Sequence, residues 1–312
     1  MTSSEQATGT LRATTGLQEL RRRVHFDWLD LAVIMMIGWA IWWFVDRIDG
    51  TLKYRWDWSI IPRFLVKTDL KTGATVPNVL LEGLFTTLRL AVWGLLLAML
   101  IGLVMGMART SKRLFFRLIA GTYVMLVRNI PPLVFVFIVV FFVASQLLTP
   151  LGINNAIARM SPEAKFWMSI LFGPPRLIEN FLSGLVCLSL FAGAYVTEIV
   201  RAGIESVPRS QLEAGESLVL TRWEIMRFIV MPQALRKVLP PLAGQFIQMV
   251  KDSSLVSLVS VQELSFMAMD IQVSTQKVFE VLIFTGGLYF VICYGLSLLF
   301  GYLERRALAG GG

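Results

Sequence analysis

Ionisable side chains lie inside long apolar stretches of the chain. Arg128, Glu198, Lys251 and Asp252 are each close to runs of Leu, Val, Ile and Phe. An ionisable group at the depth of a bilayer costs at least ~2.5 kcal/mol unless it faces protein or water. We therefore expect these groups to face inward, where they either bind a charged solute or pair with one another to hold helices together.

Catalytic and cofactor motifs are missing from the sequence. It has no Gly-rich phosphate loop ending in Lys-Ser or Lys-Thr, and its single histidine, His25, cannot form a metal-spaced cluster. Cys187 and Cys293 both lie in apolar runs, which is typical of buried small hydrophobic residues and gives no support to a disulfide or metal site. The sequence therefore predicts a protein that is not an enzyme and that binds no metal or cofactor in this chain.

The composition indicates a membrane protein. Of the 312 residues, 55% are hydrophobic and 16% are charged, and the chain contains 21 Phe and 9 Trp. Soluble domains of this length do not have this balance. The formal net charge of +8 fits basic cytoplasmic loops better than a nucleic-acid surface, because such loops are enriched in Lys and Arg. We expect the lipid bilayer, and no nucleic acid, as a partner.

Six apolar segments are long enough to cross a bilayer, so the predicted fold class is all-α and polytopic. They cover residues 29–45, 83–107, 118–147, 180–200, 239–261 and 279–302. The third segment contains Arg128, Asn129, Pro131 and Pro132, and a helix must break or bend there because proline lacks an amide donor and clashes with the preceding turn.

Basic residues set the predicted orientation and the domain limits. Lys and Arg are more numerous in the N-terminal arm, the loop near residues 109–117, the long loop at 201–237 and the tail than on the opposite side. This asymmetry places both termini in the cytoplasm. We expect a disordered arm at 1–28, a first helix with an outer interfacial segment at 29–80, a core at 81–303 and a cytosolic tail at 304–312. The outer segment could instead form part of a partner's landing surface.

A polar loop between the fourth and fifth apolar segments is longer than a connection between membrane helices requires. Its pattern predicts a short helix from Gln211 to Leu218, a turn over residues 219–222, and a second helix from Trp223 to Val230 that stops before Pro232. Thr221 and Glu224 have the spacing of a capping box. Such an amphipathic piece either docks on a soluble partner or lies as a solvated interfacial helix.

This loop resembles the cytoplasmic signature loop of ABC-importer permeases. The family pattern is Glu-Ala-Ala, three residues, Gly, nine residues, Ile, one residue, Leu-Pro; it matches here at Glu213, Ala214, Ile229 and Pro232. Gly215, Val219 and Met231 depart from it. A β-branched residue resists the left-handed backbone that a turn glycine allows by roughly 1 to 2 kcal/mol, so Val219 puts the turn geometry in doubt. The predicted coupling-loop set is Glu213, Ala214, Gly215, Glu216, Ser217, Val219, Thr221, Ile229 and Pro232.

Three further segments resemble the subfamily that imports polar amino acids, which extends the likeness over about residues 80–303. They are LEGLFTTLRLAVWG at 81–94, VRNIPPLVFVF at 127–137 and QMVKDSSLVSLVSVQEL at 248–264. The resemblance implies a type I importer permease fold in a bacterial inner membrane. It also implies two ATP-binding subunits that hold ATP and Mg, a second permease chain, identical or related, and an extracytoplasmic amino-acid-binding protein.

For such cargo, the buried polar residues predict a pathway. A zwitterionic amino acid needs a cation for its carboxylate and an acceptor for its ammonium group, and Arg128 with Glu198 or Asp252 supplies both. The alternative is that these residues only pair with one another. The predicted pathway set is Arg128, Asn129, Glu198, Lys251, Asp252, Ser253 and Ser254.

Other classes of membrane protein stay open. A self-sufficient secondary transporter would use the broken span and the buried charges, but it normally has two matching halves, and residues 29–147 do not resemble residues 180–302. A channel or signalling subunit would explain the loop but not the ordered motifs. Gly102 and Gly106 have the spacing of a close-packing helix motif, which serves packing within one chain as well as dimerisation.

Overall fold

The computed structural model describes residues 28–52, 54–69 and 73–309, and the chain divides into two compact units at Trp56 and Asp57. The predicted disordered arm, up to residue 27, and the last residues of the predicted tail lie outside the described part. In the first unit, α2 (Trp28–Leu52) begins one residue before the predicted span and presents exposed Trp and Ile side chains. Apolar residues around a whole helix are typical of a membrane span.

The second unit begins with the outer segment, which is more structured than the sequence indicated. It contains η1 (Trp58–Ile60), α3 (Ile61–Leu65) and a hairpin of β1 (Val66–Thr68) and β2 (Thr75–Pro77), antiparallel with Val66 opposite Pro77. Ile60 and Ile61 pack with Leu80 and Leu264 in one apolar cluster. The outer segment from Asp57 onward therefore belongs to the same compact unit as the predicted core.

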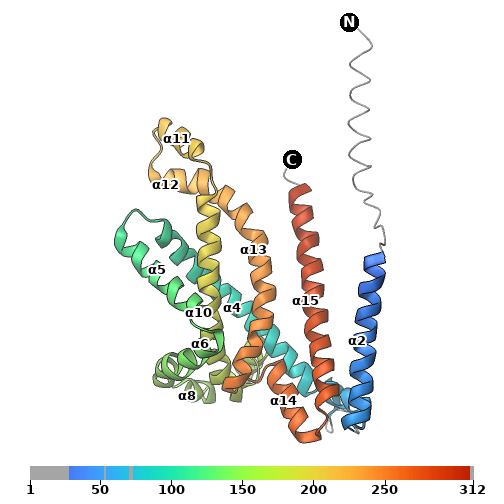
Figure 1. Cartoon of the computed structure of the whole chain (residues 1–312). Coiled ribbons are helices and arrows are strands. Elements are labelled where there is room, and N and C mark those ends of the chain that lie inside the picture. The colour runs from blue at the N-terminus through green and yellow to red at the C-terminus, as the bar shows by residue number, and fades with distance from the viewer. Residues whose placement is uncertain (1–27, 53, 70–72, 310–312) are drawn as a thin grey trace. The chain divides into compact units, whose positions relative to one another are not determined.

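Two long helices, α4 (Val79–Thr110) and α10 (Ile178–Glu205), form the centre of this unit (Figure 1). A Cβ atom at Gly102 would lie 2.4 Å from a methyl carbon of Val196, and one at Gly106 would lie 2.6 Å from a methyl carbon of Val200. The absence of side chains at both glycines therefore lets α4 approach α10. The Gly102 and Gly106 motif serves packing within the chain.

The number of spans agrees with the sequence. Five helices are long and apolar enough to cross a membrane, and a pair bent by 49°, Arg222–Val259 with Leu264–Thr275, makes up to six in the part of the chain described. The bent pair contains α13 (Met231–Asp252), η6 (Ser253–Val259) and α14 (Leu264–Thr275), and the last span is α15 (Val278–Ala309).

The third predicted span is broken where the prolines indicated, but it is not one span over 118–147. A separate helix, α5 (Leu114–Asn129), ends before Pro131. The apolar span runs from Pro132 to Leu151 and contains α6 (Pro132–Ile138), the π-turn η2 (Val139–Ala144), α7 (Ser145–Leu148) and η3 (Thr149–Leu151). Ile130 and Pro131 adopt extended ψ angles of 135° and 134°, which ends the first helix because a residue before proline avoids the helical region.

Short helices close the end of the unit opposite the polar loop. These are α8 (Ile153–Ala158), α9 (Pro162–Phe172) and η4 (Pro175–Leu177). Two side chains of α4 satisfy carbonyl groups at the end of α9, since Arg89 Nε donates to Ile170 O at 2.9 Å and Trp93 Nε1 donates to Leu171 O at 3.0 Å. The last carbonyls of a helix have no partner within it, so these bonds fasten α9 to α4.

The polar loop forms α11 (Arg209–Ser217) and α12 (Arg222–Glu224), followed by the π-turn η5 (Ile225–Val230) that leads directly into α13. The prediction that the second helix stops before Pro232 was wrong. Pro232 lies in the first turn of α13, where a missing amide donor is tolerated, and the wider turn of η5 precedes it. In Figure 1 this loop lies at the same end of the second unit as the C-terminal end of α15.

Candidate functional site

The polar loop is a small folded lobe, which we call the docking lobe and define as residues 209–230. The end of α11 is closed by two backbone hydrogen bonds, from Leu220 N to Gly215 O at 3.2 Å and from Val219 N to Glu216 O at 3.0 Å. This pair of bonds is the Schellman arrangement, which needs a left-handed residue between them. Val219 supplies it with a φ of 56°.

Val219 therefore adopts the left-handed conformation for which glycine is the usual residue. The sequence put the geometry of this turn in doubt because Val219 is β-branched. The structure retains the turn with Val219 in the left-handed position. A left-handed backbone costs an L-residue roughly 1 to 2 kcal/mol. The side chain is 89% exposed, so no packing inside the chain offsets that cost.

The second half of the docking lobe begins with the predicted capping box. Thr221 Oγ1 accepts from Glu224 N at 3.4 Å, and a Glu224 carboxylate oxygen accepts from Thr221 N at 2.7 Å. Hydrogen bonds from the hydroxyl and the amide of Thr221 lower the pKa of Glu224 below its ordinary value of 4.5. The carboxylate is thus held ionised at the start of α12, where the helix dipole also favours negative charge.

Apolar packing fixes the two halves of the docking lobe against each other. Its cluster consists of Val207, Ile225, Val230 and Ala234, with Ile229 and Leu220 beside it. A Cβ atom at Gly215 would lie 2.7 Å from Ile229 Cδ1, so the glycine that replaces alanine in the family pattern allows α11 to lie close against η5. Glu213, Ala214, Glu216, Ser217 and Pro232 are exposed. The lobe is thereby preformed, with acidic and polar groups directed outward.

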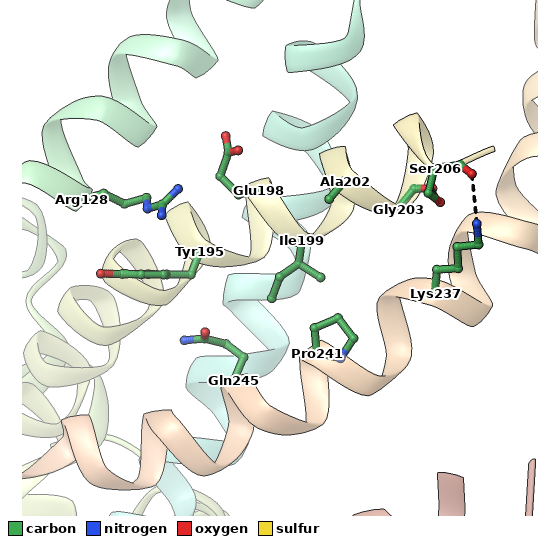
Figure 2. Close-up of a pocket in the computed structure, with 10 residues that line it drawn as sticks. All are labelled: Arg128, Tyr195, Glu198, Ile199, Ala202, Gly203, Ser206, Lys237, Pro241 and Gln245. Carbon is green, nitrogen blue, oxygen red and sulfur yellow. Dashed lines mark hydrogen bonds between the residues drawn. The ribbon is translucent and has the colours of Figure 1, made fainter. Parts of the chain in front are cut away.

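A cavity of about 510 Å³ lies between α5, α10 and α13, and we call it cavity 1. Figure 2 shows Gln245 and Pro241 of α13 facing Tyr195 and Ile199 of α10. The guanidinium carbon of Arg128 lies 5.3 Å from the centre of the Tyr195 ring, a cation–π contact. At the other end of cavity 1, Lys237 Nζ donates to Ser206 O at 3.0 Å.

Glu198 borders cavity 1 but is held by arginines. Its carboxylate lies 3.1 Å from Arg109 Nη2 and 2.7 Å from Arg201 Nη2, while Arg201 also bonds Glu205. The Glu198 side chain is 18% exposed, so these ion pairs are only partly screened by water. The carboxylate points away from α13 in Figure 2. The Arg109 pair links the end of α4 to α10.

A second cavity of about 730 Å³, cavity 2, lies along one face of α5 and shares Arg128 and Glu198 with cavity 1. It is otherwise lined by Arg109, Arg117, Leu118, Gly121, Thr122, Val124, Met125 and Asn129. Arg128 and Glu198 thus form a boundary that both cavities touch.

The structure brings only part of the predicted pathway set together. Arg128, Glu198 and Asn129 line cavities, and the amide nitrogen of Asn129 also donates to Met125 O at 2.7 Å. The remaining residues line neither of the two cavities described: Asp252 accepts from Gln248, Ser253 and Ser254 bond backbone carbonyls of their own helical turn, and Lys251 is exposed. Tyr195, Lys237 and Gln245 were not predicted. Gln245 could have been found as a polar residue inside the span predicted at 239–261.

A second buried carboxylate, Glu263, was also missed by the sequence reasoning. Glu263 is fully buried and accepts hydrogen bonds from Tyr289 Oη at 2.7 Å, Thr87 Oγ1 at 3.1 Å and Phe266 N at 2.9 Å. Thr87 in turn accepts from Leu264 N at 3.1 Å. We call Glu263, Thr87 and Tyr289 the Glu263 cluster. It joins α4, α14 and α15. The argument that singled out Asp252, the cost of an ionisable group at the depth of a bilayer, would also have found Glu263.

Comparisons with known proteins identify the class that this architecture defines. A polytopic helical unit with a polar lobe between two of its spans matches the family described as binding-protein-dependent transport system inner membrane component, over residues 73–308. The chain belongs to this family. It is a multi-pass membrane permease, and such components of ABC transporters are not themselves catalytic.

Individual relatives support the same assignment. The chain is 33% identical over 255 residues to the glutamate/aspartate import permease protein GltK of Escherichia coli O157:H7, covering 81% of this chain and 99% of the relative. It is 31% identical to the probable glutamine ABC transporter permease protein GlnM of Bacillus subtilis, covering 72% and 92%. A crystal structure of an amino acid ABC transporter with histidines aligns with a TM-score of 0.59 and 29% identity, covering 73% of this chain and 94% of that one.

Proposed function

We propose that this chain is the permease subunit of an ATP-driven importer of amino acids. The observation that carries the proposal is the preformed docking lobe at one end of a unit of the permease family, with cavity 1 between the two helices that lead into and out of it. Relatives carry names of glutamate/aspartate, glutamine and cystine systems. Those names support amino acids as the class of cargo for this chain.

The partners follow from the two ends of the second unit. The docking lobe faces the cytoplasm and binds one of two ATP-binding subunits, which hold ATP and Mg. The opposite end, with α8 and α9, faces the extracytoplasmic amino-acid-binding protein. A second permease chain, identical or related, completes the pathway, and both termini lie in the cytoplasm because the basic loops share that side.

Coupling depends on the elements that the docking lobe and cavity 1 share. Helix α10 leads into the lobe and carries Tyr195 and Glu198, whereas α13 leads out of it and carries Lys237 and Gln245. The bond from Lys237 to Ser206 joins the two helices at the base of the lobe. A displacement of the lobe by the ATP-binding subunit therefore moves two walls of cavity 1 and changes the access of cargo to Arg128.

A pull-down from native membranes in mild detergent tests this function. The tagged full chain should recover an ATP-binding subunit, identified by mass spectrometry, and Glu213→Lys should release it because the reversed charge lies on the exposed face of α11. Glu304→Lys is the matched control, since Glu304 is also exposed but lies at the end of α15, outside the lobe. A chain recovered alone in all three cases would contradict the proposal and favour a self-sufficient secondary transporter.

A further inference from the structure

The two cavities hold more positive than negative charge. Arg109, Arg117, Arg128 and Lys237 line one or both, and Glu198 is the one acidic residue among their lining residues. Asp252, the other acidic residue predicted for the pathway, lines neither of them. The electrostatic potential in such a space favours anions, because low-dielectric walls strengthen the field of the unbalanced cations.

Glu198 is already paired with two arginines, so it offers no net negative charge to a positive cargo. It lies within 3.1 Å of Arg109 and 2.7 Å of Arg201, and its carboxylate is directed away from α13 (Figure 2). Arg201 donates two hydrogen bonds to Glu198 Oε2, from Nε at 2.9 Å and from Nη2 at 2.7 Å, whereas Oε1 forms an ion pair with Arg109 but accepts no hydrogen bond from the described residues. A positive cargo group at Glu198 would therefore meet two arginines that already neutralise the carboxylate.

Arg128 is the cation that membrane topology does not account for. Lys237 and Arg117 lie near the cytoplasmic end, where basic residues are expected for topology alone. Arg128 lies in the last turn of α5, beside the break in the third predicted span, and has no carboxylate partner in the part of the chain that the structure describes. Its guanidinium instead lies over the face of the Tyr195 ring. Arg128 is exposed, and a guanidinium that borders two cavities without a carboxylate partner among the described residues can bind an incoming anion.

We propose that the cargo of this permease is an amino acid with an acidic side chain, and that Arg128 selects it by binding a carboxylate. This proposal rests on the proposed function and narrows its substrate class. Gln245 and Tyr195 border the same space and offer hydrogen-bonding groups beside Arg128. A dicarboxylic amino acid carries the net negative charge that the surplus of cations favours, whereas a basic amino acid meets no free carboxylate there.

Competitive uptake by the complete complex tests the proposal. Native-membrane vesicles that contain the permease, its ATP-binding subunits and its binding protein are given labelled L-glutamate, L-glutamine or L-lysine. Wild type should prefer glutamate over glutamine and lysine. Arg128→Gln should lower the glutamate-to-glutamine ratio by about tenfold or more, the size of one charge-assisted hydrogen bond. Arg128→Lys should restore part of the ratio because it keeps the charge.

A matched variant and a lipid series distinguish carboxylate binding at Arg128 from a general charge effect and from lipid binding. Arg113→Gln removes an exposed cation at the start of α5 that lines neither of the two cavities and should leave the ratio unchanged. The proposal is overturned if glutamine or lysine is carried as well as glutamate, or if Arg128→Gln leaves the ratio unchanged. It is also overturned if the effect of Arg128→Gln follows the anionic lipid content of reconstituted vesicles, which would assign Arg128 to a lipid headgroup.

The two proposals fail in different ways. ATP-dependent uptake of amino acids without a preference for acidic ones would overturn the assignment of cargo and leave the permease function in place. Absence of ATP-dependent uptake of every amino acid supplied would overturn both.

Discussion

The Glu263 cluster and the space around Arg128 are two polar regions inside the same apolar unit, and they differ in how their polar groups are satisfied. Glu263 is fully buried, accepts three hydrogen bonds and lines neither cavity. Arg128 borders two cavities and contacts an aromatic ring rather than a carboxylate in the described part of the chain. A polar group with all its partners in the protein fastens helices, whereas one that faces a cavity is available to a ligand.

The largest expected effect is a loss of stability when the Glu263 cluster is disrupted. Replacing Glu263 with Leu leaves Tyr289, Thr87 and the amide of Phe266 without their acceptor. Tyr289 keeps Ser265 as a hydrogen-bond partner, so two donors are left unsatisfied; at about 1 to 3 kcal/mol for each, the total loss should exceed about 2 kcal/mol. Thermal denaturation of the purified complex, followed by size-exclusion chromatography, measures it. Glu263→Gln keeps an acceptor oxygen and should lose less, and equal stability of Glu263→Leu and wild type would disprove the fastening role.

A pair of neighbouring threonines sharpens the same point. Thr87 donates to Glu263 and accepts from Leu264 N, so Thr87→Val should destabilise the complex by about 1 to 3 kcal/mol. Thr86 only donates to the carbonyl of Glu82 in its own helix, and Thr86→Val should cost clearly less. The same denaturation assay compares them, and equal losses would show that helix propensity, not the cluster, determines the result.

The space around Arg128 should tolerate the loss of a polar side chain with little change in stability. Arg128→Gln removes a cation–π contact, which is worth about 0.5 to 1 kcal/mol at a solvent-accessible site, and it leaves no buried partner unsatisfied. The melting temperature of the complex should therefore change little. A loss as large as that of Thr87→Val would place Arg128 among the residues that hold the fold.

The smallest expected effect concerns a polar group outside the membrane. Because the folded pKa of Glu224 is lowered by the hydroxyl and amide of Thr221, its contribution to the docking lobe is present above its ordinary value of 4.5 and is lost as pH falls through the lowered value. Amide hydrogen exchange of residues 221–224 should therefore show less protection at acidic pH than at neutral pH. Glu224→Gln should remove this dependence, and the same slope in that variant would disprove it.

Some of this arrangement could be predicted from sequence because it depends on local rules. Hydropathy located the apolar segments, Pro131 and Pro132 marked a helix break, and the spacing of Thr221 and Glu224 predicted the capping box. The rules failed where a neighbouring turn compensates. Pro232 continues a helix because η5 precedes it, and α5 separates from the third span because the chain is extended at Ile130.

The candidate site was less predictable because it depends on tertiary neighbours. Sequence reasoning singled out Arg128 and Glu198 as charges beside apolar segments and left open whether they bind cargo or pair with other residues; in the structure Arg128 is exposed and Glu198 is partly buried in ion pairs. The pair with Arg201 has a helical spacing of three residues that the sequence shows, whereas the pair with Arg109 joins two different helices and has no signal in sequence spacing. At Val219 the sequence suggested an altered turn, because the family pattern has glycine at that position. The structure nevertheless keeps the turn, with two backbone hydrogen bonds that end on Gly215 O and Glu216 O.

The most direct test measures stability and uptake together for Arg128→Gln and Thr87→Val in the complete complex. The difference between the two regions predicts that Arg128→Gln keeps the wild-type melting temperature and loses uptake of glutamate. It predicts that Thr87→Val lowers the melting temperature and keeps the wild-type preference for glutamate in the protein that remains folded. If both variants lose stability and uptake in the same proportion, the two regions do not have separate roles and the account is contradicted.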